Sequence, residues 1–278
     1  MLPRITRKLN KALRSTFLFH LVKSTRKSHI YCIGTAKSGT HSIEALFGDE
    51  LHSDHEPESD KVINMILAKA AGHISDAELG AYLLKRDRRL SLDIDSSQLN
   101  FFLLRKLVEL FPDAKFILTI RNPYSWLDSF VNHQLARGGS EKWMKLRDLR
   151  FRPDIYTHQP GELLLKKKGL YTLDGYLSYW AHHNRTVIDT VPEDRLLIIR
   201  TDKITGHSEE IAGFAGISIS SIRKEKSHAY KAKERFNLLD QVDQEYLEGK
   251  VQEHCGDLLA QFFPEIQSLE DAISNRTQ

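Results

Sequence analysis

Short aliphatic runs alternate with segments of helical length in this sequence, and no other feature constrains the fold as strongly. The runs are bounded by turn-forming or charged residues and cover residues 29–33, 90–94, 115–120 and 195–200. Helical patterning follows them at residues 40–47, 61–71, 76–85, 97–111, 123–137, 172–190 and 241–263. Strands that alternate with helices pair in parallel and need cover on both faces. We therefore expect an α/β fold of three layers, with a central parallel sheet flanked by helices.

The chain shows no internal repeat and no linker-like stretch, which favours one domain over residues 29–278. Within it, residues 138–169 are rich in Arg, Lys and Pro, and we expect an irregular surface insertion or lid there. The first thirty residues carry eight basic side chains and no acidic one. We expect residues 1–28 to form a basic helical arm, because apolar residues recur in it at helical spacing: Ile5, Leu9, Leu13 and Phe17.

Such an arm permits two interpretations. A basic amphipathic helix can make peripheral contact with an anionic membrane, or it can pack on the domain with a solvated basic face. The sequence favours neither a monomer nor an oligomer.

Composition excludes several classes of protein. The hydrophobic fraction is 41% and the charged fraction 28%, which provides enough apolar surface for a core and excludes disorder throughout. Cys32 and Cys255 are the only cysteines, so the chain is not a disulfide scaffold. No apolar run approaches the ~20 residues of a membrane span. The net charge of +3 does not indicate a nucleic-acid partner. We expect a cytoplasmic protein.

A glycine-containing loop follows the first expected strand and leads into a helix. Gly34 and Gly39 permit a tight turn and the close approach of a phosphate, while Lys37 supplies a positive charge and Ser38 and Thr40 supply hydroxyl donors. Backbone N–H groups at such a strand–loop–helix junction favour a bound anion. The sequence therefore predicts an anion site over residues 34–42.

The spacing in this loop differs from that of an ATP-binding Walker A loop. A Walker A motif places Lys directly after the second glycine, whereas Thr40 and His41 follow Gly39 here. A kinase that uses ATP and Mg²⁺ is therefore disfavoured but stays as an alternative. Asp93 or Asp95 could supply the carboxylate at a strand end that such a kinase needs. In an enzyme that transfers another group, we expect these two residues to shape the pocket for the molecule that accepts the group.

A second group of polar residues follows the expected strand at 115–120. Arg121 comes at the carboxyl end of that strand, where open α/β sheets bind ligands, and Ser129 follows eight residues later on a helix that begins at Pro123. A guanidinium and a hydroxyl in this arrangement can hold one phosphate together.

These two motifs together resemble those of the sulfotransferases that use 3′-phosphoadenosine-5′-phosphosulfate (PAPS), the bacterial and carbohydrate type more than the animal cytosolic type. The family's 5′-phosphosulfate loop is similar to Lys37-Ser38-Gly39-Thr40, and its 3′-phosphate motif is similar to Arg121-Asn122-Pro123 with Ser129. The resemblance implies a P-loop-like fold, a PAPS donor with PAP as its product, and no metal. It implies donor contacts from Ala36, Lys37, Ser38, Gly39, Thr40, His41, Ser42, Arg121 and Ser129.

The chain departs from the family in two places. Many cytosolic members have Thr-Thr-Trp after the loop glycine, with the Trp stacked on adenine, whereas this chain has Thr40-His41-Ser42. Adenine must then be held by Trp126 or by another aromatic side chain. The segment 222–228 loosely resembles the family's basic loop over the 3′-phosphate, which adds Arg223 to the expected donor contacts.

Sulfuryl transfer needs a base for the proton of the acceptor hydroxyl or amine. The polar segment 51–58 follows the first helix and is expected to return over the phosphate loop. Several bacterial and carbohydrate-type members use a Glu in this region, so Glu56 is our first candidate, His55 the second and His41 the third. Lys37 would neutralise charge on the departing phosphate. A non-catalytic nucleotide-binding scaffold is the further alternative, and the sequence does not identify the acceptor.

Overall fold

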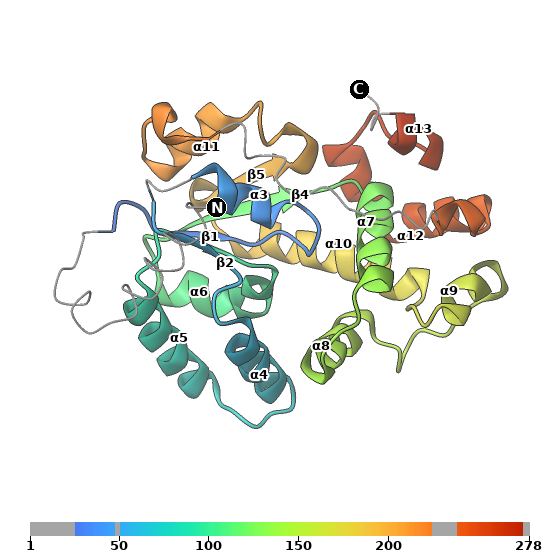
Figure 1. Ribbon diagram of the computed structural model, residues 1–278, viewed down its shortest axis with the longest axis horizontal. Helices are drawn as coiled ribbons and strands as arrows, with labels where there is room; N and C mark the ends of the chain where they lie inside the picture. The colour runs from blue at the N-terminus through green and yellow to red at the C-terminus, as the bar shows by residue number, and fades with distance from the viewer. Residues whose placement is uncertain (1–25, 48–50, 224–237, 275–278) are drawn as a thin grey trace, which may run out of the picture.

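The computed structural model describes residues 26–47, 51–223 and 238–274. Five parallel strands form its sheet in the order β2-β3-β1-β4-β5 (Figure 1). The strands are β1 (Ile30–Cys32), β2 (Ser53–His55), β3 (Ile94–Ser96), β4 (Lys115–Ile120) and β5 (Leu196–Arg200). The predicted central parallel sheet flanked by helices is confirmed. Residues 1–25 of the predicted arm and residues 224–228 of the predicted basic loop lie outside the described residues.

Helices lie on both sides of the sheet (Figure 1). Side chains of one face, including Ile30 and Ile117, pack with α3 and α11, while those of the other, including Tyr31 and Phe116, pack with the α4–α6 region and the end of α10. Adjacent residues of a strand point to opposite faces, which explains this division. The helices are α3 (Thr40–Leu46), α4 (Ser59–Ala70), α5 (Asp76–Leu90), α6 (Leu104–Leu110), α7 (Pro123–Ala136), α8 (Glu141–Phe151), α9 (Leu163–Lys167), α10 (Leu173–Thr190), α11 (Ser208–Ala215), α12 (Gln244–Phe262) and α13 (Leu269–Ser274).

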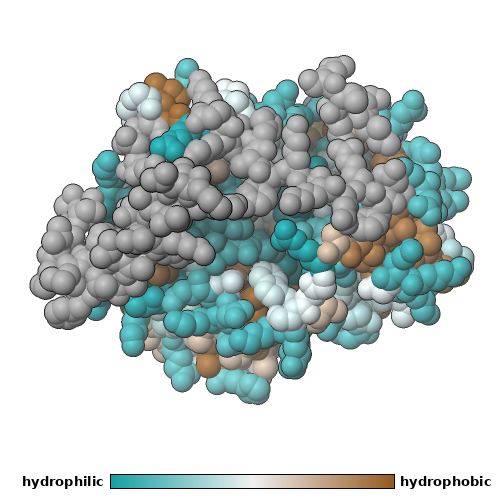
Figure 2. All heavy atoms as spheres, in the orientation of Figure 1, coloured by the Kyte–Doolittle hydropathy of each residue, from teal (hydrophilic) through white to brown (hydrophobic). Residues whose placement is uncertain are grey.

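The apolar residues are mostly internal. Where residues are coloured, the face in Figure 2 is largely hydrophilic. A third cluster joins Ile120 at the end of β4 to α7, α10 and α12, and includes the fully buried Trp126 and Trp180. None of the described helices is both long and apolar enough to cross a membrane.

Four local predictions differ from the structure. The helix expected at 97–111 is divided into the 3₁₀ turn η1 (Gln98–Leu103) and α6. The strand expected at 90–94 begins only at Ile94, because α5 continues to Leu90 and ends with Ser91 in a left-handed conformation at φ 46°. The segment expected to be a polar loop contains β2, whose Ser-Asp-His sequence is tolerated at a sheet edge. Residues 138–169 contain α8, α9 and the 3₁₀ turn η2 (Pro160–Glu162), so the prediction of an irregular segment is wrong. Helix α8 buries Leu146 and Phe151 in spite of its many charges.

A buried histidine joins the end of β1 to α10. The His183 side chain is fully buried, with its Nε2 2.7 Å from the Ile33 carbonyl oxygen and its Nδ1 3.2 Å from the Tyr179 hydroxyl. A carbonyl only accepts, so Nε2 carries the proton and Nδ1 accepts from the Tyr179 hydroxyl. Phe101 stacks on the ring with centroids 4.1 Å apart. Burial lowers the pKa of His183 to about 3.

This depressed pKa predicts a loss of stability in acid. An unfolded His has a pKa near 6.5, so between about pH 6.5 and 3 the unfolded chain binds a proton that the folded chain excludes. The contribution of His183 is complete above about pH 6.5, and the free energy of unfolding falls as the pH drops below it. We expect urea unfolding of His183→Gln to depend less steeply on pH than that of the wild type between pH 6.5 and 5. The exposed His73→Gln is the matched control, and equal slopes for His183→Gln and the wild type would contradict the assignment.

Candidate active site

The loop between β1 and α3, residues 33–39, crosses the carboxyl end of the sheet and needs both of its glycines. A Cβ on Gly34 would lie 1.9 Å from Oγ1 of Thr119 on the neighbouring strand β4. Gly39 has φ 104°, and a Cβ there would lie 2.8 Å from the Ile204 side chain. Lys37 also has a positive φ of 69°. The loop is therefore tightly turned and pressed against β4 and the segment after β5.

Three side chains from other elements bind successive carbonyl groups of this β1–α3 loop. Nε1 of Trp126, on α7, donates to the Ala36 carbonyl at 2.8 Å, and Nη1 of Arg121 donates to the Lys37 carbonyl at 3.1 Å. The hydroxyl of Thr201, directly after β5, donates to the Ser38 carbonyl. The carbonyls of residues 36 to 38 therefore all point toward donors of the α7, β4 and β5 side.

This clamping fixes the direction of the amide groups. In a trans peptide the N–H points opposite to the carbonyl of the preceding residue, and the described chain contains no cis peptide. The N–H of Lys37 therefore points away from Trp126, and the N–H of Gly39 points away from Thr201. The N–H of Ser38 donates instead to the Thr35 carbonyl at 3.2 Å. Amide groups turned outward from such a loop form an anion-binding concavity.

The hydroxyls of the predicted motif have different surroundings. Ser38 is fully buried, and its Oγ donates to the Thr35 carbonyl at 2.7 Å and lies 3.1 Å from Oγ1 of Thr119. The Thr40 Oγ1 lies 3.2 Å from Nε2 of His55 on β2. The Ser38 side chain thus shapes the loop from inside, while Thr40 connects it to the edge strand.

The side chain of Lys37 lies in a positively charged environment. Burial lowers its pKa, and the charges of Arg121 and Arg137 lower it further. Burial also lowers the pKa of His133, on α7, to about 4, with added effects from Lys37, Arg137 and Arg147. Cations that cluster at the carboxyl end of the sheet favour an anionic ligand. Each positive charge makes the charged form of its neighbours less stable until an anion neutralises them.

Arg121 and the start of α7 form the second half of the site. The Asn122 side chain caps α7 by accepting from the Ser125 backbone N–H at 2.9 Å, and Pro123 occupies the first turn as predicted. Nε of Arg121 donates to the Ser125 hydroxyl at 3.0 Å, which fixes the guanidinium plane beside the β1–α3 loop. Ser129 lies about two turns into α7 and is half-buried.

The edge strand β2 brings the candidate bases to the same end of the sheet. The rings of His41 and His55 stack with centroids 4.6 Å apart, so β2 lies beside the start of α3, where the phosphate loop ends. Burial lowers the pKa of His55, and His41 adds to this while Glu56 opposes it. Glu56 follows β2 with φ 50°, and its Oε1 accepts from Nε2 of Gln98 at 2.6 Å.

Two sequence-based expectations fail because the residues serve the core. Asp95 is buried and pairs with the buried Arg86, and Asp93 accepts from the backbone N–H groups of Lys27, Ser28 and His52 at 2.6, 3.0 and 2.8 Å. Neither shapes an acceptor pocket. Trp126 is fully buried, so it offers no exposed ring face to adenine.

Arg223 lies at the opposite end of α3 from the loop, where its backbone N–H donates to the Leu46 carbonyl at 2.8 Å. Three residues with contacts in the site were not predicted: Thr201, Gln98 and His133. Gln98 and Thr201 each follow a strand, and this position is the sequence signal that could have indicated them. His133 lies near the second motif, on the same helix as Ser129.

Comparison with known proteins identifies the family. Residues 29–221 match the sulfotransferase domain family, and the chain belongs to it, since the match spans well over half of its length. This assignment indicates a transferase. A search of curated proteins gives no match.

Solved sulfotransferases show distant similarity. One from Alicyclobacillus acidocaldarius is 14% identical over 81% of this chain and 92% of its own, with a TM-score of 0.44. A mouse sulfotransferase in complex with PAP is 12% identical over 81% of this chain and 67% of its own (TM-score 0.35). The sulfotransferase domain of a Synechococcus olefin synthase is 14% identical over 80% and 82% (TM-score 0.36).

The carbonyl clamp predicts a local effect of Trp126→Phe. This variant keeps the ring in the core but removes the donor to the Ala36 carbonyl, at a cost of ~1 kcal/mol for a neutral hydrogen bond. We expect the Ser38 amide, which is hydrogen-bonded inside the loop, to exchange with deuterium about fivefold faster, as measured by NMR. Trp143→Phe on α8 is the matched control. Unchanged exchange at Ser38 in Trp126→Phe would show that the indole does not hold the loop.

Proposed function

We propose that this protein transfers a sulfuryl group from PAPS to a hydroxyl or amine of an acceptor by in-line displacement. The observation that carries the proposal is the clamping of three successive carbonyls, which turns the N–H groups of Lys37 and Gly39 outward beside two cationic side chains. Membership of the sulfotransferase family supports the reaction type. The likeness of both motifs to those of PAPS-dependent members supports the donor.

The donor carries two anionic groups, and the site offers a separate set of contacts for each. The β1–α3 loop, with the Lys37 side chain and the N–H groups of Lys37 and Gly39, is assigned to the 5′-phosphosulfate. Arg121 and Ser129 are assigned to the 3′-phosphate. Arg121 also donates to the Lys37 carbonyl, so it holds the position of the loop while its own plane is fixed by Ser125.

The transfer step follows from these assignments. The acceptor oxygen or nitrogen attacks sulfur, a bond to sulfur forms, and the bond from sulfur to the bridging phosphate oxygen breaks. Negative charge grows on that oxygen as PAP departs. The Lys37 ammonium neutralises it, and a group already held in place does so without reorganisation of solvent.

Glu56 is assigned as the base that takes the acceptor proton. It lies at the end of β2, its backbone N–H donates to the Ser96 carbonyl at 2.9 Å, and Gln98 orients its carboxylate. His55 is the alternative base. Its Nε2 already contacts the Thr40 hydroxyl, and its ring is stacked on His41, which favours a role in supporting α3.

Donor binding tests the two cationic anchors. We expect calorimetry to show that PAP binds without Mg²⁺ and that Lys37→Ala and Arg121→Ala each weaken binding by about tenfold or more, since each removes a charge-assisted contact. Lys106→Ala and Arg185→Ala are matched controls, because both residues form surface ion pairs on other helices. Binding of ATP–Mg²⁺ in the absence of PAP binding would reject the sulfotransferase assignment and favour the kinase alternative.

Substitution of the base should affect the rate and spare the donor site. With ³⁵S-labelled PAPS and a metabolite extract as the source of acceptor, we expect Glu56→Gln to slow transfer by about 100-fold or more, the usual range for a general base. We expect PAP affinity to change little and His55→Gln to have a smaller effect on the rate. If Glu56→Gln transfers at the wild-type rate, Glu56 is not the base, although the family assignment stands. Normal PAP binding by a wild type that transfers no label would favour the non-catalytic scaffold.

A further inference from the structure

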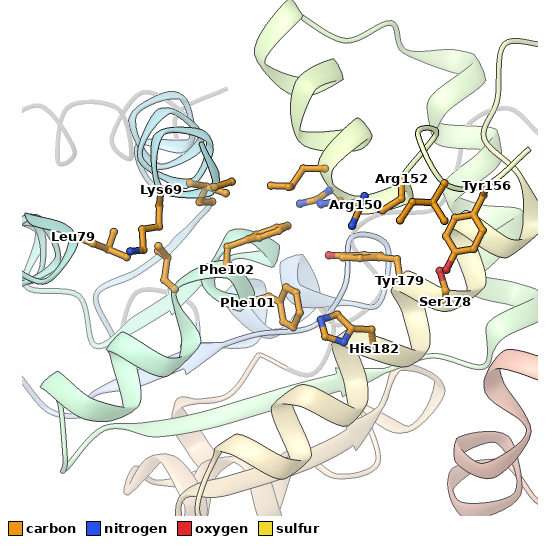
Figure 3. Close-up of a pocket in the computed structure, with 15 residues that line it drawn as sticks. Lys69, Leu79, Phe101, Phe102, Arg150, Arg152, Tyr156, Ser178, Tyr179 and His182 are labelled. Carbon is orange, nitrogen blue, oxygen red and sulfur yellow. The ribbon is translucent and has the colours of Figure 1, made fainter. Parts of the chain in front are cut away.

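A cavity of about 470 Å³ opens between α4, α8, α10 and the 3₁₀ turn η1 (Gln98–Leu103) (Figure 3). Its volume lies within the range of small-molecule sites. Its lining includes none of the residues assigned to the donor or to the base, and most of its walls are apolar or aromatic. Principal wall residues are Ile66, Leu79, Phe101, Phe102, Leu149 and Tyr179.

The charged side chains that line this cavity are all basic. The lining includes Lys69, Arg150, Arg152 and His182 but no Asp or Glu. Two of the cations are paired outside it: Lys69 with Asp76 at 2.8 Å and Arg152 with Asp154 at 2.9 Å. Arg150 differs from both.

Arg150 is buried without a counter-charge. Its side chain is among the buried polar groups, with the residue only 5% exposed. Its Nε and Nη2 are both inaccessible to water and find no hydrogen-bond partner in the described part of the chain, where Arg150 also forms no ion pair. Its guanidinium lies over the rings of Phe102 and Tyr179, 5.4 and 5.6 Å from their centroids, and reaches toward the cavity (Figure 3).

A buried guanidinium such as that of Arg150 destabilises the folded protein unless a negative charge or a hydrogen-bond acceptor lies beside it. Removing a guanidinium from water without an anionic partner has a large desolvation penalty, and ring faces recover only part of it. A carboxylate suits the guanidinium best, because it supplies the missing negative charge and accepts a charge-assisted hydrogen bond from an N–H group that faces the cavity. The aromatic and aliphatic walls would receive the apolar body of the same ligand.

We propose that this cavity binds an organic carboxylate with an apolar body, with the carboxylate on Arg150 and the body against Phe102, Ile66 and Leu149. The proposal does not depend on the proposed function, since the cavity and the β1–α3 loop have no residue in common.

Decanoate and decanol provide the test, because they share a chain and differ in the charged group. We expect calorimetry to show one decanoate bound per chain and decanol bound about tenfold more weakly or not at all. Arg150→Met keeps the apolar volume and should lose the preference for decanoate. Arg152→Met, two residues away on the same side of the cavity, is the matched control and should keep it. Thermal unfolding should show a higher midpoint with decanoate for the wild type and no such shift for Arg150→Met.

Several results would overturn the proposal. Equal affinity of the wild type for decanoate and decanol would show that no cation selects the ligand, and this comparison holds even if Arg150→Met does not fold. Retained preference in Arg150→Met would remove Arg150 from the site. Loss of decanoate binding in Lys37→Ala would place the anion in the β1–α3 loop. If the wild type binds PAP but not decanoate, the carboxylate site in the cavity is rejected and the proposed function stands. If it binds decanoate but not PAP, only the proposed donor is rejected.

Discussion

The capture of the Ala36, Lys37 and Ser38 carbonyls by Trp126, Arg121 and Thr201 is the interaction on which the candidate site depends. The peptide group is rigid, so a carbonyl held on one side places its amide on the other. Donors from α7, β4 and the end of β5 thus decide where the loop amides point. Trp126, one of these donors, is fully buried, and Arg121 directly follows β4.

Further hydrogen bonds from α10 hold the strand ends that lead into the clamp. Trp180 on α10 donates to the Arg121 carbonyl at 3.1 Å, and His183, one turn later, donates to the Ile33 carbonyl. One helix therefore supports the ends of both β1 and β4. This support places Lys37 and Arg121 side by side, and their mutual repulsion contributes to the lowered pKa of Lys37. An anion relieves that repulsion, so the cations around Lys37 favour a bound anion.

The parts of the site that the sequence predicted share one property: each is contiguous along the chain. Residues 34–42 and 121–129 each carry a strand end, a turn and a helix start, so local signals locate them. Contacts that depend on the third dimension could not be predicted. Thr201 looks like any hydroxyl after a strand, and Asp95 looks like a site carboxylate until Arg86 is seen beside it.

Patterns of polarity explain the errors in secondary structure. The β2 segment has no apolar residue, because an edge strand needs none to pair, and α8 has its two core residues hidden among basic ones. Arg150 belongs to the same helix, and only the structure shows that its charge is buried in an aromatic cavity.

The backbone amides of the β1–α3 loop report directly whether the loop binds an anion. In ¹⁵N-resolved NMR spectra recorded during a titration with PAP, we expect the amide protons of Lys37 and Gly39 to shift downfield together at saturation, because they form new hydrogen bonds to a phosphate. The Ser38 amide, already bound to Thr35, should move less. Saturation by PAP with the Lys37 and Gly39 signals unmoved would show that these two amides do not bind the phosphate.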